Sequence, residues 1–368
     1  MMVRLLGRCV SLLLGLSAAA SMAGPAAVVV GPSAPAAPPS ASASAPSFGP
    51  VAAGGERRAT AERSVGDWLM RMHEASRKRA YAGTFVVSSA AGGLASARIW
   101  HACEGDQQME RVESLTGPQR SIFRRNDQVM TFMPDLKIAR AERRESLGLF
   151  PNLLKSVDSP IDEFYTAKPL GSDRVAGFDA DVVQLAPKDT LRFGYRVWTE
   201  RKSGLVVKLQ TLDVDGRVLE QSAFSELQFD APVKMDKLAQ MMANTEGYKV
   251  EKPEITKTTA AAEGWALKSP VPGFLPMSCY KRVLNGGGPN APESAIQWIF
   301  SDGLASVSLF VEAYDHQRHT QEMLRVMGAT QTLTKHLVDK AGDWWLTAVG
   351  EVPFQTLKAF AQGLERRK

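Results

Sequence analysis

The spacing of apolar residues changes from a helical to a strand period between Arg79 and Tyr81. Apolar residues recur at positions i, i+3, i+4 and i+7 from Val65 to Met72, directly after Ser64 and with Asp67 three positions beyond that serine. This spacing places the apolar side chains on one helix face, and the serine with its acidic partner resembles a capping box. We therefore predict an amphipathic helix that ends near Arg79.

From Tyr81 to about Phe229, apolar and polar residues alternate in short segments, which is typical of strands. The first segment starts at Tyr81 and turns at residues 91–93 into a return strand through His101. Later segments lie at 191–198, 205–212 and 217–224, with turn sequences at 202–204 and 213–216 between them. Successive hairpins predict an antiparallel meander, open or partly closed, with one face available to bury apolar groups.

A segment from Arg140 to Tyr165 interrupts this alternation. It combines a basic cluster at Arg140, Arg143 and Arg144 with apolar residues between positions 147 and 154. The pattern predicts helical or irregular structure that lies across the sheet as a cover.

Residues 244–263 are polar and show no hydrophobic period, and Gly247 and Pro253 break any regular element there. Such a stretch is typical of a linker between domains. We therefore predict an N-terminal domain at 61–243 and a C-terminal domain at 264–368, each long enough for its own core.

The C-terminal domain contains apolar segments at 297–300, 307–311 and 344–349. Pro353, a residue favoured in the first turn of a helix, then precedes apolar residues at helical spacing, namely Leu357, Phe360, Ala361 and Leu364. The fold class that follows is α+β, with a large antiparallel N-terminal domain and a smaller α+β C-terminal domain.

The first 23 residues are typical of a secretory signal peptide. Arg4 and Arg8 form a basic start, an apolar block follows at 9–20, and small residues at 21–23 suit a signal peptidase. The alternative is an uncleaved anchor, but the block is shorter than the roughly 20 residues that a spanning helix needs. Residues 24–60 are rich in Pro, Ala, Ser and Gly, which predicts a disordered tether.

Export limits the functions that charge and cysteines suggest. Removing Arg4 and Arg8 reduces Lys and Arg from 44 to 42 against 39 Asp and Glu, a net charge of about +3. Because these charges are spread along an exported chain, they do not predict nucleic-acid binding. Cys103 and Cys279 lie far apart in sequence and in different predicted domains, which favours two separate thiols over a disulfide.

The chain contains no motif that predicts catalysis, a cofactor or a metal. Nucleotide-binding loops, a nucleophile elbow, C-x-x-C and H-E-x-x-H are all missing from the sequence. The Asp213–Gly216 stretch resembles a calcium loop, but its glycine comes too early and no glutamate stands at the twelfth position, so a hairpin turn is favoured. His316 and His319 lack a third ligand nearby, which favours solvated histidines over a metal site. A hydrolase is therefore a weak alternative.

Two sets of residues are the candidates for binding. Aromatic and apolar side chains of the helix and strands could line a lipid-sized pocket or form an ordinary core: Trp68, Leu69, Met72, Tyr81, Phe85, Phe132, Phe193 and Tyr195. Arginines could bind phosphate or carboxylate groups, or form a solvated face: Arg120, Arg124, Arg125, Arg140, Arg143 and Arg144.

Dispersed motifs in both domains resemble the RseB/MucB family of sigma-factor regulatory proteins. In the N-terminal domain these are 68–75, 81–87, His101, 110–111, 194–198, 203–205 and 216–224, and in the C-terminal domain 272–274, 301–312 and 349–353. They extend in order from Ser64 to Lys368, so the resemblance covers both predicted domains.

The resemblance implies an N-terminal half-barrel like the lipoprotein carriers LolA and LolB, covered by helices. It also implies a periplasmic protein that binds the periplasmic domain of a transmembrane anti-sigma factor of the RseA/MucA type and protects it from regulated proteolysis. Lipid, lipopolysaccharide or mislocalised lipoprotein would release that partner. A carrier of lipids or lipoproteins without a signalling partner is the alternative, and the sequence leaves a homo-oligomer open.

Overall fold

The computed structural model of the chain describes residues 63–143, 161–283, 294–340 and 342–367. All of these residues belong to one compact unit. The predicted signal peptide and tether lie outside the described residues, as does most of the predicted cover at 140–165. Within the described ranges, no helix is long and apolar enough to cross a membrane.

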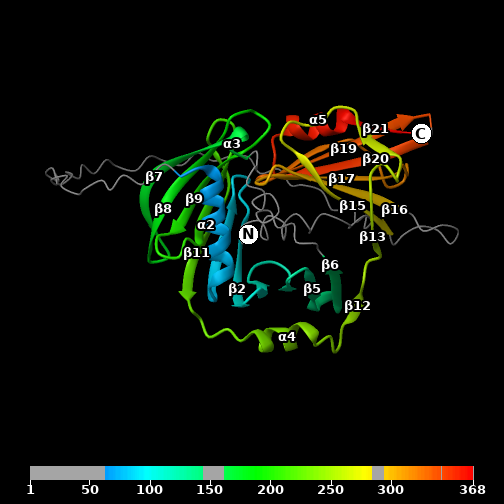
Figure 1. Cartoon of the computed structure of the whole chain (residues 1–368). Helices are drawn as coiled ribbons and strands as arrows, with labels where there is room; N and C mark the ends of the chain where they lie inside the picture. The colour runs from blue at the N-terminus through cyan, green and yellow to red at the C-terminus, as the bar shows by residue number, and fades with distance from the viewer. Residues whose placement is uncertain (1–62, 144–160, 284–293, 341, 368) are drawn as a thin grey trace, which may run out of the picture. The chain divides into compact units, whose positions relative to one another are not determined.

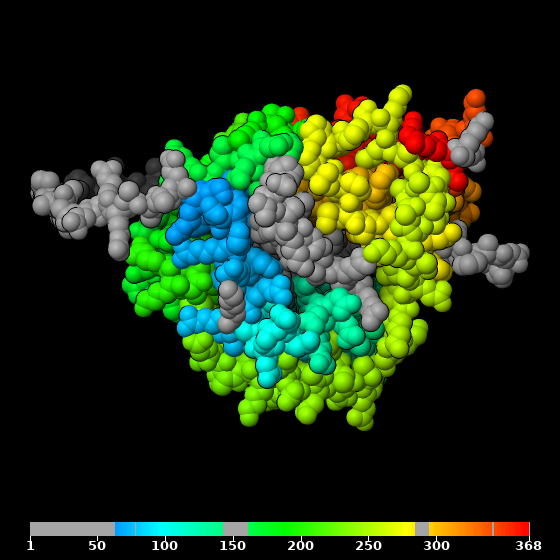
Figure 2. Space-filling model, viewed as in Figure 1, coloured from blue at the N-terminus to red at the C-terminus, as the bar shows by residue number. Residues whose placement is uncertain are grey.

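The first helix, α2 (Val65–Lys78), confirms the predicted amphipathic helix and its capping box. The Asp67 amide donates to Ser64 Oγ at 3.0 Å, and the Ser64 amide donates to Asp67 Oδ2 at 3.2 Å. These bonds satisfy amides that the helix itself cannot pair. The apolar side of α2 is buried and its polar side stays at the surface, where it shows as the blue region of Figure 2.

Twelve described strands form a first sheet, antiparallel throughout except that β12 runs parallel to β6. In the order of pairing they are β12 (Lys249–Glu251), β6 (Ile138–Arg143), β5 (Gln128–Met133), β4 (Ser121–Arg125), β3 (Gln107–Ser114), β2 (Leu94–Glu104), β1 (Tyr81–Ser89), β11 (Val218–Phe229), β10 (Val206–Leu212), β9 (Gly194–Glu200), β8 (Phe178–Pro187) and β7 (Tyr165–Val175). The hairpins β1–β2, β9–β10 and β10–β11 confirm the predicted meander.

Helices cover both faces of the first sheet (Figure 1). On one face α2 packs with Ile99, and on the other α4 (Met235–Ala243) packs with Ala102. These two residues of β2 differ by an odd number of positions, and side chains alternate between the faces of a strand, so the two helices lie on opposite faces. The short helix α3 (Ile161–Phe164) leads directly into β7, and the 3₁₀ turn η1 (Pro134–Leu136) joins β5 to β6.

A second sheet forms the C-terminal part of the chain. Its strands, in pairing order, are β13 (Ile255–Thr258), β15 (Leu275–Val283), β16 (Ser294–Ser301), β17 (Ser306–Ala313), β20 (Gly342–Gly350), β19 (Thr330–Asp339) and β18 (Leu324–Met327). The helix α5 (Phe354–Gly363) buries Leu357 and Phe360 in the core of this sheet, at the predicted helical spacing. A two-stranded ladder of β14 (Trp265–Leu267) and β21 (Leu364–Arg366) places Arg366 over the rings of Trp265 and Trp344.

The structure confirms the α+β class and corrects one local prediction. Arg140, expected in a helical or irregular cover, lies in strand β6, and Tyr165 at the other end of that segment begins strand β7. The predicted linker 244–263 contains β12, which joins the first sheet, and β13, which joins the second. Only residues 252–254 separate these two strands. The domain boundaries themselves stay a prediction.

Candidate functional site

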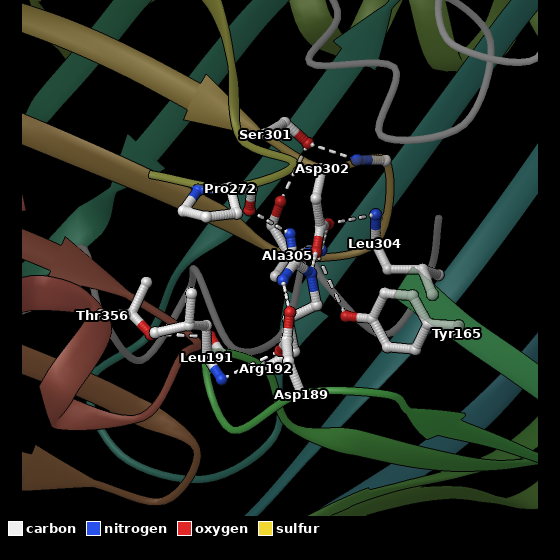
Figure 3. A network of polar contacts seen from close by, with 11 residues as sticks. Tyr165, Asp189, Leu191, Arg192, Pro272, Ser301, Asp302, Leu304, Ala305 and Thr356 are labelled. Atoms are coloured by element: carbon white, nitrogen blue, oxygen red, sulfur yellow. Dashed lines mark hydrogen bonds and ion pairs between the residues drawn. The ribbon is translucent and has the colours of Figure 1, made fainter. Parts of the chain in front are cut away.

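The connection between β8 and β9 carries Arg192, whose side chain is fully buried between groups from both sheets. Its Nε donates to Asp302 Oδ2 at 2.8 Å, and its Nη2 donates to the carbonyl oxygen of Pro272 at 2.5 Å. Its Nη1 donates to Asp189. Figure 3 shows the guanidinium at the centre of this network. Every edge of the guanidinium therefore meets an acceptor, as a buried charge requires.

Two aromatic rings lie against the guanidinium of Arg192. Its Cζ is 4.3 Å from the ring centre of Phe164 in α3 and 4.8 Å from that of Phe274, which precedes β15. A guanidinium stacks on aromatic faces more readily than an ammonium group does, because it is planar and weakly hydrated. The site therefore suits arginine and not lysine.

Asp302 is the partner of Arg192 in the turn between β16 and β17, and its side chain is also fully buried. One carboxylate oxygen, Oδ1, accepts from the amides of Leu304 and Ala305 at 2.8 and 2.6 Å. The other, Oδ2, accepts from Arg192 and from the hydroxyl of Tyr165 at 3.2 Å. Asp302 thus shapes its own turn and joins that turn to the first sheet.

The same turn inserts Leu304 into the core of the first sheet. Leu304 is 3% exposed and packs in one cluster with Trp68 and Tyr195. Ser301 stiffens the turn, since its Oγ donates to the Ala305 carbonyl at 2.8 Å and accepts from the Gly303 amide at 3.0 Å. We call residues 301–305 together with Arg192 the junction.

The start of α5 adds two further bonds to the junction. Thr356 Oγ1 donates to the carbonyl of Leu191 at 2.6 Å, and Gln355 donates to the carbonyl of Thr190. These carbonyls belong to the residues just before Arg192. The β8–β9 connection is therefore bonded to α5 as well as to Asp302 and Pro272.

Gly273 is required by the close approach of Arg192. Its φ is +76°, and a Cβ at this position would stand 2.1 Å from Arg192 Nη2 and 2.7 Å from the Phe164 ring. We expect Gly273→Ala to lower the free energy of unfolding by about 2–4 kcal/mol, combining backbone strain with displacement of Arg192.

Urea denaturation of Gly273→Ala and Gly177→Ala measures the effect of that contact. Gly177 has a similar φ of +85°, but a Cβ at this position would meet no other atom within 4 Å, so it reports backbone strain alone at about 1 kcal/mol. Equal losses in the two variants would contradict the role of the close approach.

A second contact between the sheets surrounds Glu220 of β11. A Cβ on Gly328, in the β18–β19 turn, would lie 2.2 Å from Glu220 Oε2, so this turn fits closely over the carboxyl. Burial, together with the smaller effect of the Glu351 charge, raises the pKa of Glu220 to about 7, and a hydrogen bond from the Ala329 amide opposes this rise. Glu220 is therefore a partly buried acid whose pKa lies near neutral.

The eight predicted pocket residues are all buried, but they fall into different clusters. Trp68, Leu69, Met72 and Tyr195 share one cluster under α2, whereas Tyr81 and Phe85 belong to a second and Phe132 to a third beside α4. Phe193 is buried next to Arg192 in the chain. A lipid-sized pocket that these residues share stays a prediction.

The predicted arginines are distributed over β4, β6 and the turn before β4. Arg124 Nε donates to the carbonyl of Asn126 at 2.9 Å, and Arg140 pairs with Glu251 of β12 at 3.1 Å. Arg120 lies in the β3–β4 turn, and Arg125 is exposed at the end of β4. The side chain of Arg143 and all of Arg144 lie outside the described residues. An anion site at these arginines stays a prediction.

The prediction of a solvated His319 is wrong. This residue is 8% exposed, stacks on Trp345 with ring centres 4.8 Å apart, and accepts from the Asp315 amide at 2.9 Å through Nδ1. His101 is also buried, with Nδ1 3.2 Å from Glu110 Oε1.

No group of three or more His, Cys, Asp or Glu in the described ranges could hold a metal ion. Cys103 and Cys279 are free thiols in different sheets.

Sequence reasoning did not find Arg192 or Asp302. The strand alternation placed Arg192 on the polar side of its segment, together with Arg196. Two motifs of the family resemblance, 272–274 and 301–312, contain residues of the junction or residues that contact it. The sequence alone gave no physical reason for these motifs. The structure explains them, because Gly273 and Asp302 both contact the side chain of Arg192.

Comparisons with known proteins cover both sheets. Residues 64–242 match the model of the MucB/RseB N-terminal domain, and residues 259–365 match that of the MucB/RseB C-terminal domain. The chain is 29% identical to the sigma factor AlgU regulatory protein MucB of Pseudomonas aeruginosa over 82% of its own length and 91% of the relative. It is 26% identical to the sigma-E factor regulatory protein RseB of Escherichia coli K12 over 83% of its own length and 92% of that relative.

Solved structures give the same result. The crystal structure of MucB in complex with MucA(peri) is similar with a TM-score of 0.61 and 26% identity, over 82% of this chain and 98% of that one. The complex structure of Pseudomonas aeruginosa MucA/MucB is similar with a TM-score of 0.64 and 27% identity, over 82% of this chain and 99% of that one.

Proposed function

Because the chain belongs to the MucB/RseB family of sigma-factor regulatory proteins, which are not enzymes, we propose that it negatively regulates an envelope-stress sigma factor from the periplasm. It binds the periplasmic domain of a transmembrane anti-sigma factor and protects that domain from regulated proteolysis. Lipid, lipopolysaccharide or mislocalised lipoprotein releases the partner.

One observation carries the proposal. Both family models match in order along the chain, and the similarity to a MucB structure that contains MucA(peri) extends over 98% of that chain. A carrier of lipid or lipoprotein would need only the N-terminal fold. It would not be expected to retain the second sheet and the motifs of the junction. This favours a signalling partner over a carrier of lipid or lipoprotein alone.

Release requires two states that differ in affinity for the anti-sigma factor. A ligand that bound both states equally would change nothing, however tightly it bound. The junction supports such a switch because Leu304 of the second sheet packs against Trp68 and Tyr195, which belong to the predicted apolar pocket. A lipid that entered this cluster would have to displace Leu304 or rearrange around it. In this proposal the movement takes place about the predicted linker at 244–263.

A protease-protection assay tests the proposal. The mature protein is mixed with the soluble periplasmic domain of the anti-sigma factor and the protease of the regulated cascade, with and without lipopolysaccharide. We expect intact anti-sigma factor without lipopolysaccharide and cleavage with it. Cleavage at equal rates with and without the protein would refute the proposal. Lipid binding without any binding of the anti-sigma factor would instead support the carrier.

A further inference from the structure

The β18–β19 turn of the second sheet lies over one cross-strand pair of the first sheet. Ser89 of β1 and Glu220 of β11 stand opposite each other in that pair. A Cβ on Gly328 would lie 2.2 Å from Glu220 Oε2 and 3.3 Å from Ser89 Cβ, so the turn rests on both side chains. Ala329, the next residue of the turn, is 1% exposed. The turn is therefore a packed contact between the sheets, made by residues other than those of the junction.

The neighbours of Glu220 on its own sheet do not compensate its charge. Ser89 stands opposite it on one side and Thr211 of β10 on the other, and both are neutral. Asp213, two positions beyond Thr211, accepts from two amides of its own turn, and the other two charged residues of that turn pair with each other. A charged Glu220 would thus depend on the second sheet for stabilisation.

The second sheet places one hydrogen-bond donor and one like charge against this carboxyl. The Ala329 amide donates to it, and the Glu351 carboxylate acts on it through its charge. Gln331 of β19 pairs with Gly350 of β20, which places Glu351 beside the start of β19, next to the turn. A neutral Glu220 keeps the bond from the amide and meets no repulsion. A charged Glu220 lies partly buried against a second negative charge.

We propose that this contact is an acid-dependent clasp between the two sheets, which holds the β18–β19 turn on β11 at low pH and loosens as the pH rises. In the lifted state, in which the turn has moved off Glu220, the carboxyl returns to water and leaves Glu351. The lifted state therefore favours the charged carboxyl, and the closed state favours the neutral one. In the junction, by contrast, Arg192 compensates the charge of Asp302.

The pKa of Glu220 sets the range and the direction of the effect. It is about 7 in the closed state, above the ordinary value of 4.5 that the lifted state would restore. Protons therefore bind the closed state more tightly, and the stability that they give it is complete below about pH 4.5 and lost as the pH rises through about 7. Each pH unit between the two values changes the ratio of closed to lifted molecules by up to about tenfold.

The clasp adds pH to the factors that control how the two sheets move. In the proposed function, release of the partner needs such a movement, so the clasp would make release easier in alkaline solution. This last step rests on the proposed function, whereas the clasp itself is a property of the protein alone.

Hydrogen exchange of the Ala329 amide tests the clasp, because this amide is the donor that the turn gives to Glu220. Its exchange in the mature protein is followed by NMR at about pH 5 and about pH 8.5, and each rate is divided into the intrinsic rate at that pH. We expect this protection to fall by at least about tenfold from the lower to the higher pH in the wild type. It should stay unchanged in Glu220→Gln, because glutamine still accepts from the amide and carries no charge.

Two further variants control the measurement. Glu226→Gln removes a charge from an exposed position on the same strand, so its protection should fall as in the wild type. Glu351→Gln removes the like charge and leaves Glu220 and the turn unchanged, so the fall should remain but its midpoint should move to lower pH. Equal melting temperatures at about pH 5 would show that the variants are folded.

Three results would overturn the proposal. The first is wild-type protection that does not change with pH, and the second is an equal fall in Glu220→Gln. The third is a midpoint in Glu351→Gln that is the same as in the wild type or higher, because the two carboxylates would then not oppose each other. The exchange experiment contains neither anti-sigma factor nor lipopolysaccharide, so the clasp and the proposed function can fail separately.

Discussion

Replacing Arg192 with methionine is expected to lower the free energy of unfolding by about 3–5 kcal/mol, the range for removal of one partner from a buried ion pair. Both Arg192 and Asp302 have fully buried side chains, at an Nε–Oδ2 distance of 2.8 Å. The variant leaves the Asp302 carboxylate buried without its cation. Three donors remain on Asp302, the Tyr165 hydroxyl and the Leu304 and Ala305 amides, but none of them carries a charge.

Urea denaturation measures this loss, with Arg196→Met as the matched control. Arg196 lies in β9 and is half-buried, and its Nη1 is 3.4 Å from Gln210 Oε1, so we expect a loss below about 1 kcal/mol. The double variant Arg192→Met, Asp302→Leu removes both charges and should recover part of the stability, since apolar replacements of buried ion pairs are often tolerated. An Arg192→Met protein as stable as Arg196→Met would show that the junction contributes little.

Replacing Glu220 with glutamine is expected to stabilise the protein in alkaline solution by up to about 3 kcal/mol, and to have little effect in acid. The folded-state pKa of Glu220 is about 7, above its ordinary value of 4.5, so the folded protein binds the proton more tightly than the unfolded chain does. The stability linked to this proton is present below about pH 4.5 and is lost as the pH rises through about 7. Glutamine stays neutral throughout and avoids that loss.

The test compares unfolding free energies of the wild type and Glu220→Gln at about pH 5 and about pH 8.5, on either side of the folded-state pKa. Glu226→Gln is the control, because Glu226 lies on the same strand and is exposed. The benefit of Glu220→Gln should grow with pH and that of Glu226→Gln should not. A benefit that is the same at both pH values would mean that the carboxyl is not held in an unfavourable environment.

Elements defined by local pattern could be predicted from the sequence. The stripe from Val65 to Met72 is sufficient for α2, because helix formation and capping depend on residues within one or two turns. The hairpin at 213–216 was equally accessible, since Asp213 Oδ1 accepts from the amides of Asp215 and Arg217 inside the turn itself. In both cases the residues that determine the structure are neighbours in the chain.

The junction could not be predicted in this way. Arg192 and Asp302 are 110 positions apart, so no local period relates them. The side of the β8–β9 connection on which Arg192 lies would be polar in an isolated sheet and becomes buried only when the second sheet covers it. Arg140 is a second case. It lies in strand β6 and pairs with Glu251 of β12, and these two strands are distant in the sequence but run parallel beside each other. The tertiary contact overrides the local pattern.

The pairing of β12 with β6 has a consequence for how far the two sheets can separate. Residues 252–254 alone span the interval between β12 and β13, so the ends of these strands can move apart by at most about 14 Å. If the junction opens while β12 stays paired, Asp302 remains near Arg192 at a high effective concentration, and reclosure is an intramolecular step. Opening would then be brief without a ligand, and a ligand would act by occupying the space that Leu304 leaves.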